Sequence, residues 1–248
     1  MFEAARISPS LLSADFMNME RDLRLIEEAG VGFVHVDVMD GHFVSNLTMG
    51  VPFVKQLKRI TALPLDVHLM ISNPLVQIPW FLAAGADWLT VHIEALDLEA
   101  GEAHKAISLI RQSGAHPSFS LKPKTPLSLV RPYLADLDMV LVMSVEPGFS
   151  GQSFIEGSNE RIEQLAAWAS EANTALLIEI DGGIDASTIE GAVKAGADVI
   201  VAGNAIFASP DPAAALKELK ALAQAANIKA NTKAKASPEA FDRTAGHD

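Results

Sequence analysis

One pattern recurs along this chain: a short apolar run, a polar loop and then an amphipathic stretch. Apolar runs that do not alternate with polar residues are typical of parallel strands covered by helices. The predicted strands are Ile7–Leu11, Phe33–Asp37, Leu65–Leu69, Trp88–His92, Pro117–Leu121, Met139–Met143, Leu176–Ile180 and Val199–Ala202. The predicted helices are Met19–Ala29, Val51–Ile60, Leu75–Ala84, Glu102–Ser113, Leu127–Leu134, Glu160–Glu171, Ser187–Ala195 and Pro212–Ala225.

Eight strand–helix units in 248 residues match the size of a closed (β/α)₈ barrel, the TIM barrel. Glycine follows a small residue between helix and strand, as at Ala29-Gly30 and Ala195-Gly196, where a left-handed cap can turn the chain back. A doubly wound open sheet is the alternative, but no GxGxxG motif follows the first predicted strand. We therefore predict a single α/β barrel domain over residues 1–226.

The composition changes after this domain. The segment Asn227–Asp248 is rich in Lys, Ala, Asn, Thr and Ser and has few large apolar residues. Such a segment cannot bury enough apolar surface to offset the entropy lost on ordering. We predict that residues 227–248 form a flexible, disordered polar tail.

Charge and cysteine content narrow the class of protein. The formal net charge of −12 argues against broad binding to nucleic acid or to anionic membranes, but not against one anionic substrate. The chain has no cysteine, which fits a reducing compartment. The first residues show no basic start followed by an apolar run, and the apolar runs are too short to span a bilayer. We expect a cytoplasmic enzyme.

Histidines and carboxylates stand at predicted strand ends, where a barrel of this kind forms its active site. His35 and Asp37 are two residues apart and so point to the same side of their strand. His68 ends the third strand and Asp181 the seventh. Each residue alone could simply cap a loop, but together they could bind one divalent metal. For His92 and Glu94, at the end of the fourth strand, we expect a supporting hydrogen-bonding role.

Glycine-rich segments follow the last three predicted strands. They are Glu146–Gln152, Asp181–Gly183 and Ala202–Ala205. Glycine lets backbone N–H groups approach an anion closely, and barrels often hold phosphate in these loops. One such segment alone indicates a tight turn, whereas three in succession favour a phosphate cradle.

Together these segments resemble the ribulose-phosphate 3-epimerase family, from about Ile7 to about Ala223. The matching stretches are Ser8–Leu11, Ser13–Phe16, His35–Phe43, Asp66–Met70, His92–Ala95, Val142–Phe149 and Glu179–Gly183. The resemblance implies a (β/α)₈ barrel that binds one divalent metal per subunit through His35, Asp37, His68 and Asp181. We expect Zn²⁺, although Fe²⁺, Mn²⁺ and Co²⁺ also suit these ligands.

The resemblance further implies the substrate contacts and the partner of the site. The implied contacts are Ser10, His68, Gly148, Phe149, Ser150, Gly151, Asp181, Gly182, Gly183, Gly203 and Asn204. The molecule bound at the site is a small sugar-phosphate substrate. We expect the protein to form a homo-oligomer and to bind neither nucleic acid nor a membrane. Where Ser45, Ser150 and Lys122 stand, many members have Pro, Gly and Asn; the last two differences bear on which sugar is preferred.

The implied reaction is epimerisation at C3, converting D-ribulose 5-phosphate to D-xylulose 5-phosphate in the pentose phosphate pathway. Loss of a proton next to a ketone gives an enediolate, which a metal stabilises as a Lewis acid. Asp37 and Asp181 are the implied acid and base: one removes the C3 proton and the other protonates the opposite face.

Other functions also fit the residues. Within the epimerases, D-allulose 6-phosphate is the alternative substrate. A Schiff-base aldolase could use Lys122 or Lys124, near the end of the fifth predicted strand. A sugar-phosphate binding protein without catalysis is a third class, against which the two aspartates argue.

Overall fold

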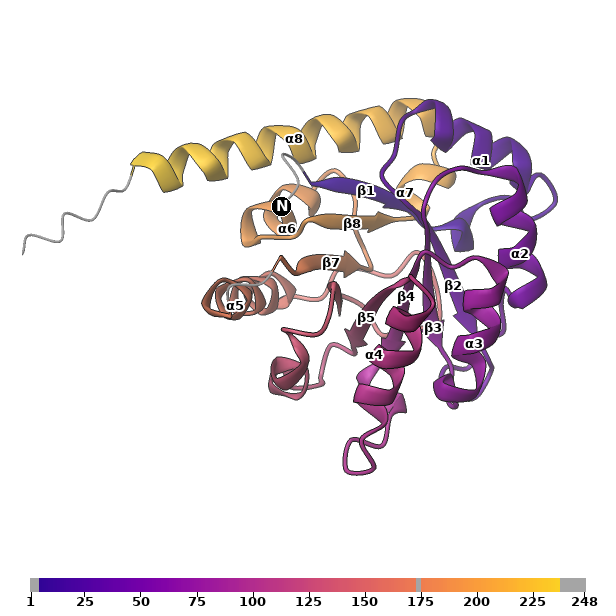
Figure 1. Cartoon of the computed structure of the whole chain (residues 1–248). Helices are drawn as coiled ribbons and strands as arrows, with labels where there is room; N and C mark the ends of the chain where they lie inside the picture. Colours follow the sequence, from indigo (N-terminus) through magenta and orange to yellow (C-terminus); the bar gives the residue numbers. More distant parts are fainter. Residues whose placement is uncertain (1–4, 173–174, 237–248) are drawn as a thin grey trace, which may run out of the picture.

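The computed structural model describes residues 5–172 and 175–236, with side chains described as far as Asn227. Eight parallel strands form a barrel with helices around it (Figure 1). The strands are β1 (Arg6–Pro9), β2 (Val34–Met39), β3 (Leu65–Met70), β4 (Trp88–His92), β5 (His116–Leu121), β6 (Met139–Met143), β7 (Leu177–Asp181) and β8 (Val199–Ala202). Each lies within two residues of its predicted bounds, so the single-barrel prediction is confirmed.

The barrel closes at a narrow seam. The hydrogen-bonded order runs from β1 through β8 and down to β2, with every neighbouring pair parallel. Between β1 and β2, the closure is an isolated parallel bridge from Ser10 to His35. The bridge that closes the barrel therefore joins two of the predicted site residues.

Helices cover the outside of the barrel with their apolar faces. They are α1 (Met19–Glu28), α2 (Val51–Ile60), α3 (Pro74–Ala84), α4 (Glu102–Gln112), α5 (Ser158–Glu171), α6 (Ile189–Ala195), α7 (Asn204–Phe207) and α8 (Pro212–Ala236). Single turns of 3₁₀ helix are η1 (Leu11–Ser13), η2 (Ile93–Ala95), η3 (Leu127–Leu129) and η4 (Arg131–Tyr133). In α4, Ala103, Ala106, Ile107 and Ile110 are buried, at the spacing of one helical face.

Two predicted helices differ from the structure. The helix predicted over Leu127–Leu134 is instead η3 and η4, because Pro132 has no N–H to donate inside a continuous helix. The last helix continues past its predicted end at Ala225 to Ala236, so the predicted tail Asn227–Asp248 begins inside α8. The remainder of that predicted tail, residues 237–248, lies outside the described residues.

The barrel interior changes from apolar to polar along its axis. At the amino ends of the strands, Phe33, Met139, Leu177 and Val199 form an apolar cluster with Trp88. Beyond it, buried polar side chains come from four alternate strands: Ser8, Asp66, Ser118 and Glu179. This polar interior leads to the predicted site at the carboxyl ends.

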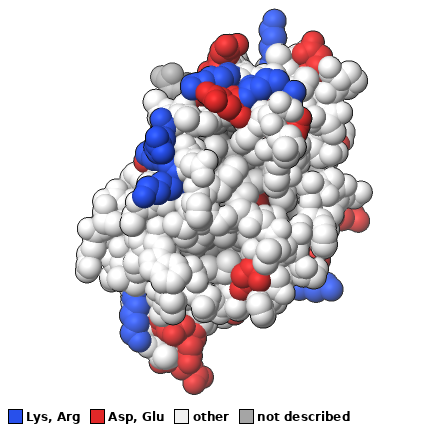
Figure 2. Space-filling view, turned by 90° about the vertical axis from the view of Figure 1, so that its right-hand side faces the viewer, with Lys and Arg blue, Asp and Glu red and all other residues white. Residues whose placement is uncertain are grey.

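Two features of the described residues bear on membrane and nucleic-acid contacts: the apolar length of the helices and the distribution of charge on one face. No helix there combines the length and the apolar character needed to cross a membrane. On the face drawn in Figure 2, uncharged side chains cover most of the surface, and charged ones stand mainly toward its edges. That face therefore has no broad basic patch of the kind that binds a phosphate backbone.

Candidate active site

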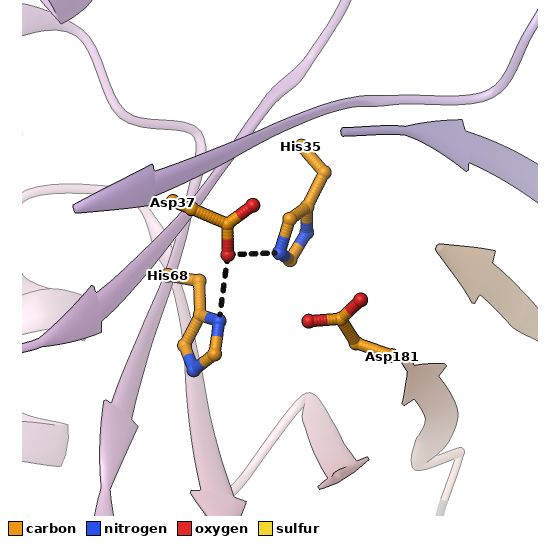
Figure 3. A group of neighbouring side chains, drawn as sticks. All are labelled: His35, Asp37, His68 and Asp181. Carbon is orange, nitrogen blue, oxygen red and sulfur yellow. Dashed lines mark ion pairs between the residues drawn. The ribbon is translucent and has the colours of Figure 1, made fainter. Parts of the chain in front are cut away.

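Four predicted residues meet at the carboxyl end of the barrel (Figure 3). His35 and Asp37 come from β2, His68 from β3 and Asp181 from the end of β7, and one ligand atom of each lies within 4.8 Å of the others. Oδ1 of Asp37 is 3.4 Å from Nε2 of His35 and 3.3 Å from Nδ1 of His68. Asp181 faces this group from the opposite wall (Figure 3).

The donor atoms of this cluster fit a divalent metal. Nε2 of His35 and Nδ1 of His68 are buried, and neither has a hydrogen-bond partner among the described residues. A buried nitrogen without a partner is costly, and here both such nitrogens face carboxylate oxygen. Two imidazole nitrogens with two carboxylates are ligands that zinc, iron(II), manganese and cobalt accept. The arrangement can therefore hold one such ion.

Burial and charge push the pKa values of the two aspartates apart. Burial alone would raise the pKa of Asp37, but His35 and His68 outweigh it and hold that pKa well below its usual range. Burial raises the pKa of Asp181 to about 6, and the charge of Asp37 acts in the same direction. The two carboxyl groups therefore differ in proton affinity.

Asp66 and Glu179 lie behind His35. Nδ1–H of His35 donates a 2.5 Å hydrogen bond to Oδ2 of Asp66, and Oε1 of Glu179 is 3.8 Å from the same nitrogen. Burial raises the pKa of Glu179 well above its usual value, and the charge of Asp66 adds to the effect. Burial would lower the pKa of His35, but Asp66 and Asp37 raise it well above the usual value.

Neither Asp66 nor Glu179 was assigned a role from the sequence. The signal was present in the twofold period of a strand, because each stands two residues before a predicted metal ligand and shares its side of the strand.

His92 and Glu94 lie behind His68. Nε2 of His68 is 3.0 Å from Nε2 of His92, whose Nδ1 is 3.2 Å from Oε2 of Glu94. Burial lowers the pKa of His92 to about 4, against the opposite effect of Glu94. Burial alone would raise the pKa of Glu94, but its hydrogen bond with His92 and further contacts lower it to about 2. Both residues thus have the hydrogen-bonding position expected from the sequence.

A cavity of about 560 Å³ opens above the four-residue cluster. Asp37, Asp181 and the loops after β6, β7 and β8 line it, and Met39, Met70 and Met143 add apolar surface. Of the predicted substrate contacts, the lining includes Ser10, Gly148, Phe149, Ser150, Gly151, Asp181, Gly182, Gly183, Gly203 and Asn204. His68 is fully buried and is not part of the lining.

The loop after β7 depends on two consecutive glycines. Gly182 and Gly183 both have positive φ, and a Cβ at Gly183 would lie 2.3 Å from the backbone nitrogen of Phe154. The Ser144 hydroxyl donates to the carbonyl oxygens of Asp181 and Gly182, at 2.9 and 2.6 Å. The loops after β6 and β7 are therefore packed backbone to backbone, which suits close approach to an anion.

The lysines considered for a Schiff base do not line the cavity. Lys122 and Lys124 are both absent from its lining. The ammonium group of Lys122 instead lies 3.9 Å from the centre of the Phe43 ring. Neither lysine therefore belongs to the cavity that Asp37 and Asp181 line.

A parallel barrel with two aspartates and two buried histidines at the carboxyl end of its strands, opening to a glycine-lined cavity, defines a (β/α)₈-barrel enzyme equipped for acid–base chemistry. The ribulose-phosphate 3 epimerase family model matches residues 6–207. The chain belongs to this family, and it is an isomerase.

Individual relatives agree with this assignment. The chain is 47% identical to the ribulose-phosphate 3-epimerase of Treponema pallidum (strain Nichols), over 81% of this chain and 90% of that protein. It is 41% identical to the Bacillus subtilis (strain 168) enzyme of the same name, over 87% of this chain and 98% of that protein. The orotidine 5'-phosphate decarboxylase structure from Pyrococcus horikoshii OT3 shares the fold, with a TM-score of 0.64, 18% identity and coverage of 88% and 99% of the two chains.

Proposed function

We propose that the protein interconverts D-ribulose 5-phosphate and D-xylulose 5-phosphate by inverting C3, through proton transfer by Asp37 and Asp181. The observation that carries the proposal is the placement of these two carboxyl groups on opposite walls of one cavity end. A single base would tend to return the proton to the face that it left. Two carboxyl groups that face each other allow removal on one side and delivery on the other.

His35, Asp37, His68 and Asp181 would hold the divalent metal, for which we propose Zn²⁺. When bound, the ion supplies Lewis-acid stabilisation of negative charge on the substrate oxygens. The aspartate that is ionised at the start accepts the C3 proton, and the electrons of the C–H bond pass into the enediolate. The other aspartate, which is protonated at the start, then gives its proton to the opposite face of C3. Each turnover leaves the two aspartates with exchanged protonation states, which solvent must reset.

The loops after β6, β7 and β8 would hold the phosphate. Gly151, Gly183 and Gly203 line the same cavity as the two aspartates. Phosphate binding away from C3 fixes the sugar in register, and that binding energy lowers the entropic barrier to proton transfer.

Incubation with D-ribulose 5-phosphate in D₂O tests the proposal. We expect D-xylulose 5-phosphate to form, with deuterium from the solvent at C3 of the product. Efficient turnover of D-allulose 6-phosphate in its place would move the substrate to the six-carbon class. Trapping of a covalent adduct by borohydride would contradict the mechanism, because proton transfer by carboxyl groups forms no imine.

A further inference from the structure

The two histidines of the cluster expose opposite ring nitrogens to it. His35 has Nε2 toward Asp37 and Nδ1 toward Asp66, whereas His68 has Nδ1 toward Asp37 and Nε2 toward His92. Each nitrogen that faces Asp37 lacks a hydrogen-bond partner among the described residues. The nitrogens that face away are the ones engaged by neighbouring side chains.

Counting donors and acceptors shows which ring nitrogens carry protons in the hydrogen-bonded series His68–His92–Glu94. If Nδ1 is a metal ligand, its lone pair must be free, so the ring proton of neutral His68 is on Nε2. Nε2–H then donates to Nε2 of His92, 3.0 Å away. His92 accepts there and carries its own proton on Nδ1, which donates to Oε2 of Glu94 over 3.2 Å. The acceptor oxygen of Glu94 at the end of this series lets each hydrogen bond form in this direction.

The far end of this chain is held in place by the loop after β5. The second oxygen of Glu94 accepts a hydrogen bond from the backbone N–H of Lys122, at 2.7 Å, and another from the hydroxyl of Thr125. Arg161 of α5 donates to the carbonyl oxygens of Thr125 and Lys122, at 2.8 and 3.2 Å. The Glu94 carboxylate is therefore oriented by contacts independent of the cluster.

We infer that His92 and Glu94 are positioning residues that fix the tautomer and ring orientation of His68, so that Nδ1 is presented to the metal, while Asp66 presents Nε2 of His35. The inference rests on the proposed metal site. Outer partners of this kind hold a histidine ligand in one tautomer and typically change metal affinity about 10–100-fold when they are removed.

The tautomers can be read directly by ¹⁵N NMR of the zinc-loaded protein labelled at histidine. We expect zinc on Nδ1 of His68 with a proton on Nε2, and the reverse assignment for His35. His92 should carry its only ring proton on Nδ1. Zinc on Nε2 of His68, or a proton on Nε2 of His92, would overturn the inference without any variant.

Zinc affinity of His92→Phe, measured by competition with a chelator, tests the positioning role. We expect binding about 10–100-fold weaker than in the unmodified protein. Glu94→Gln, which keeps the side-chain volume, should weaken binding in the same direction and serves if His92→Phe fails to fold. The matched control is His116→Phe: His116 is also paired with a carboxylate, Asp138, at 2.6 Å, but belongs to the amino end of β5.

The control should bind zinc within about twofold of the unmodified protein. Unchanged zinc affinity in both His92→Phe and Glu94→Gln would overturn the inference. These measurements need no substrate, so absence of epimerase activity would overturn the proposed function alone and leave the tautomer assignment standing.

Discussion

The Ser10 hydroxyl donates a 2.6 Å hydrogen bond to Oδ2 of Asp37 across the seam between β1 and β2. This bond occupies one carboxylate oxygen and leaves Oδ1 facing His35 and His68. Barrel closure and the orientation of a proposed catalytic base thus depend on the same pair of strands.

We expect Ser10→Ala to lower kcat/KM about ten- to hundredfold, because a hydrogen bond to a charged group contributes about 1.5–3 kcal/mol. Ser8→Ala is the matched control: Ser8 is buried in β1, two residues before Ser10, and its hydroxyl has no hydrogen-bond partner among the described residues. The control should retain kcat/KM. Equal losses in both variants would show that the effect comes from packing of β1.

Metal removal should abolish turnover. His35 and His68 direct partnerless buried nitrogens at a carboxylate, which is an arrangement that a cation completes. The test is strong chelation, verification of metal content by elemental analysis, an activity assay and re-addition of Zn²⁺. Full activity in verified metal-free protein would contradict a metal-assisted reaction.

The site was predictable from sequence where only periodicity and topology mattered. Residues two apart share one side of a strand, and a closed parallel barrel brings all its strand ends together, so His35, Asp37, His68 and Asp181 could be grouped without coordinates. The partner of His35 could not be named, because it depends on the register that sets His35 beside Asp66. That register is a property of strand pairing.

The two helix errors also have local causes. The apolar pattern over Leu127–Leu134 is that of one helix, and the prediction followed this pattern without giving weight to Pro132, which interrupts the helix. In α8, residues 227–236 are polar enough to suggest disorder, but Ala and Lys are also strong helix formers. Low apolar content limits burial, and it does not by itself prevent a helix from continuing.

Deletion of residues 228–248 should leave the melting temperature and kcat nearly unchanged. Among the α8 side chains that the structure describes, those buried against the barrel are Leu216, Leu219, Ala223 and Ala226, and all four precede the deletion. The comparison is thermal unfolding and steady-state kinetics of the two chains. A large loss of either quantity would show that the deleted part contacts the barrel or another subunit.

Asp40 should make the stability of the protein depend on pH in acid. Its carboxylate accepts hydrogen bonds from the backbone N–H groups of His42, Phe43 and Ser72, each at 2.8 Å. Burial opposes these bonds, but together they lower its pKa from 3.8 to about 2. Because the folded state favours the charged form, this stabilisation is present above the unfolded pKa and is lost as the pH falls through the folded one.

The measurement is the free energy of unfolding of the unmodified protein and of Asp40→Asn, by urea titration between pH 5 and pH 2. The variant should be less stable at pH 5, and the difference should shrink as the pH falls from about 4 toward 2. A difference that stays constant over this range would show that the carboxylate charge does not stabilise the loop.

The two proposed bases should be separable by isotope exchange. Asp37→Asn and Asp181→Asn should each lower the rate of epimerisation about a thousandfold or more, since loss of general acid–base catalysis typically costs about 10²–10⁴-fold and each residue is also a proposed metal ligand. An amide keeps the size of the side chain but cannot accept the C3 proton. If one aspartate faces each side of C3, each variant retains the base for one epimer only. It should then exchange deuterium from solvent into that epimer without inverting it, and the two variants should label opposite epimers.

Metal content must be matched before the comparison, because ligand loss alone would slow both reactions. Near-normal inversion by either metal-loaded variant would contradict the two-base assignment and would direct attention to Glu94 and His92, the next titratable groups behind His68.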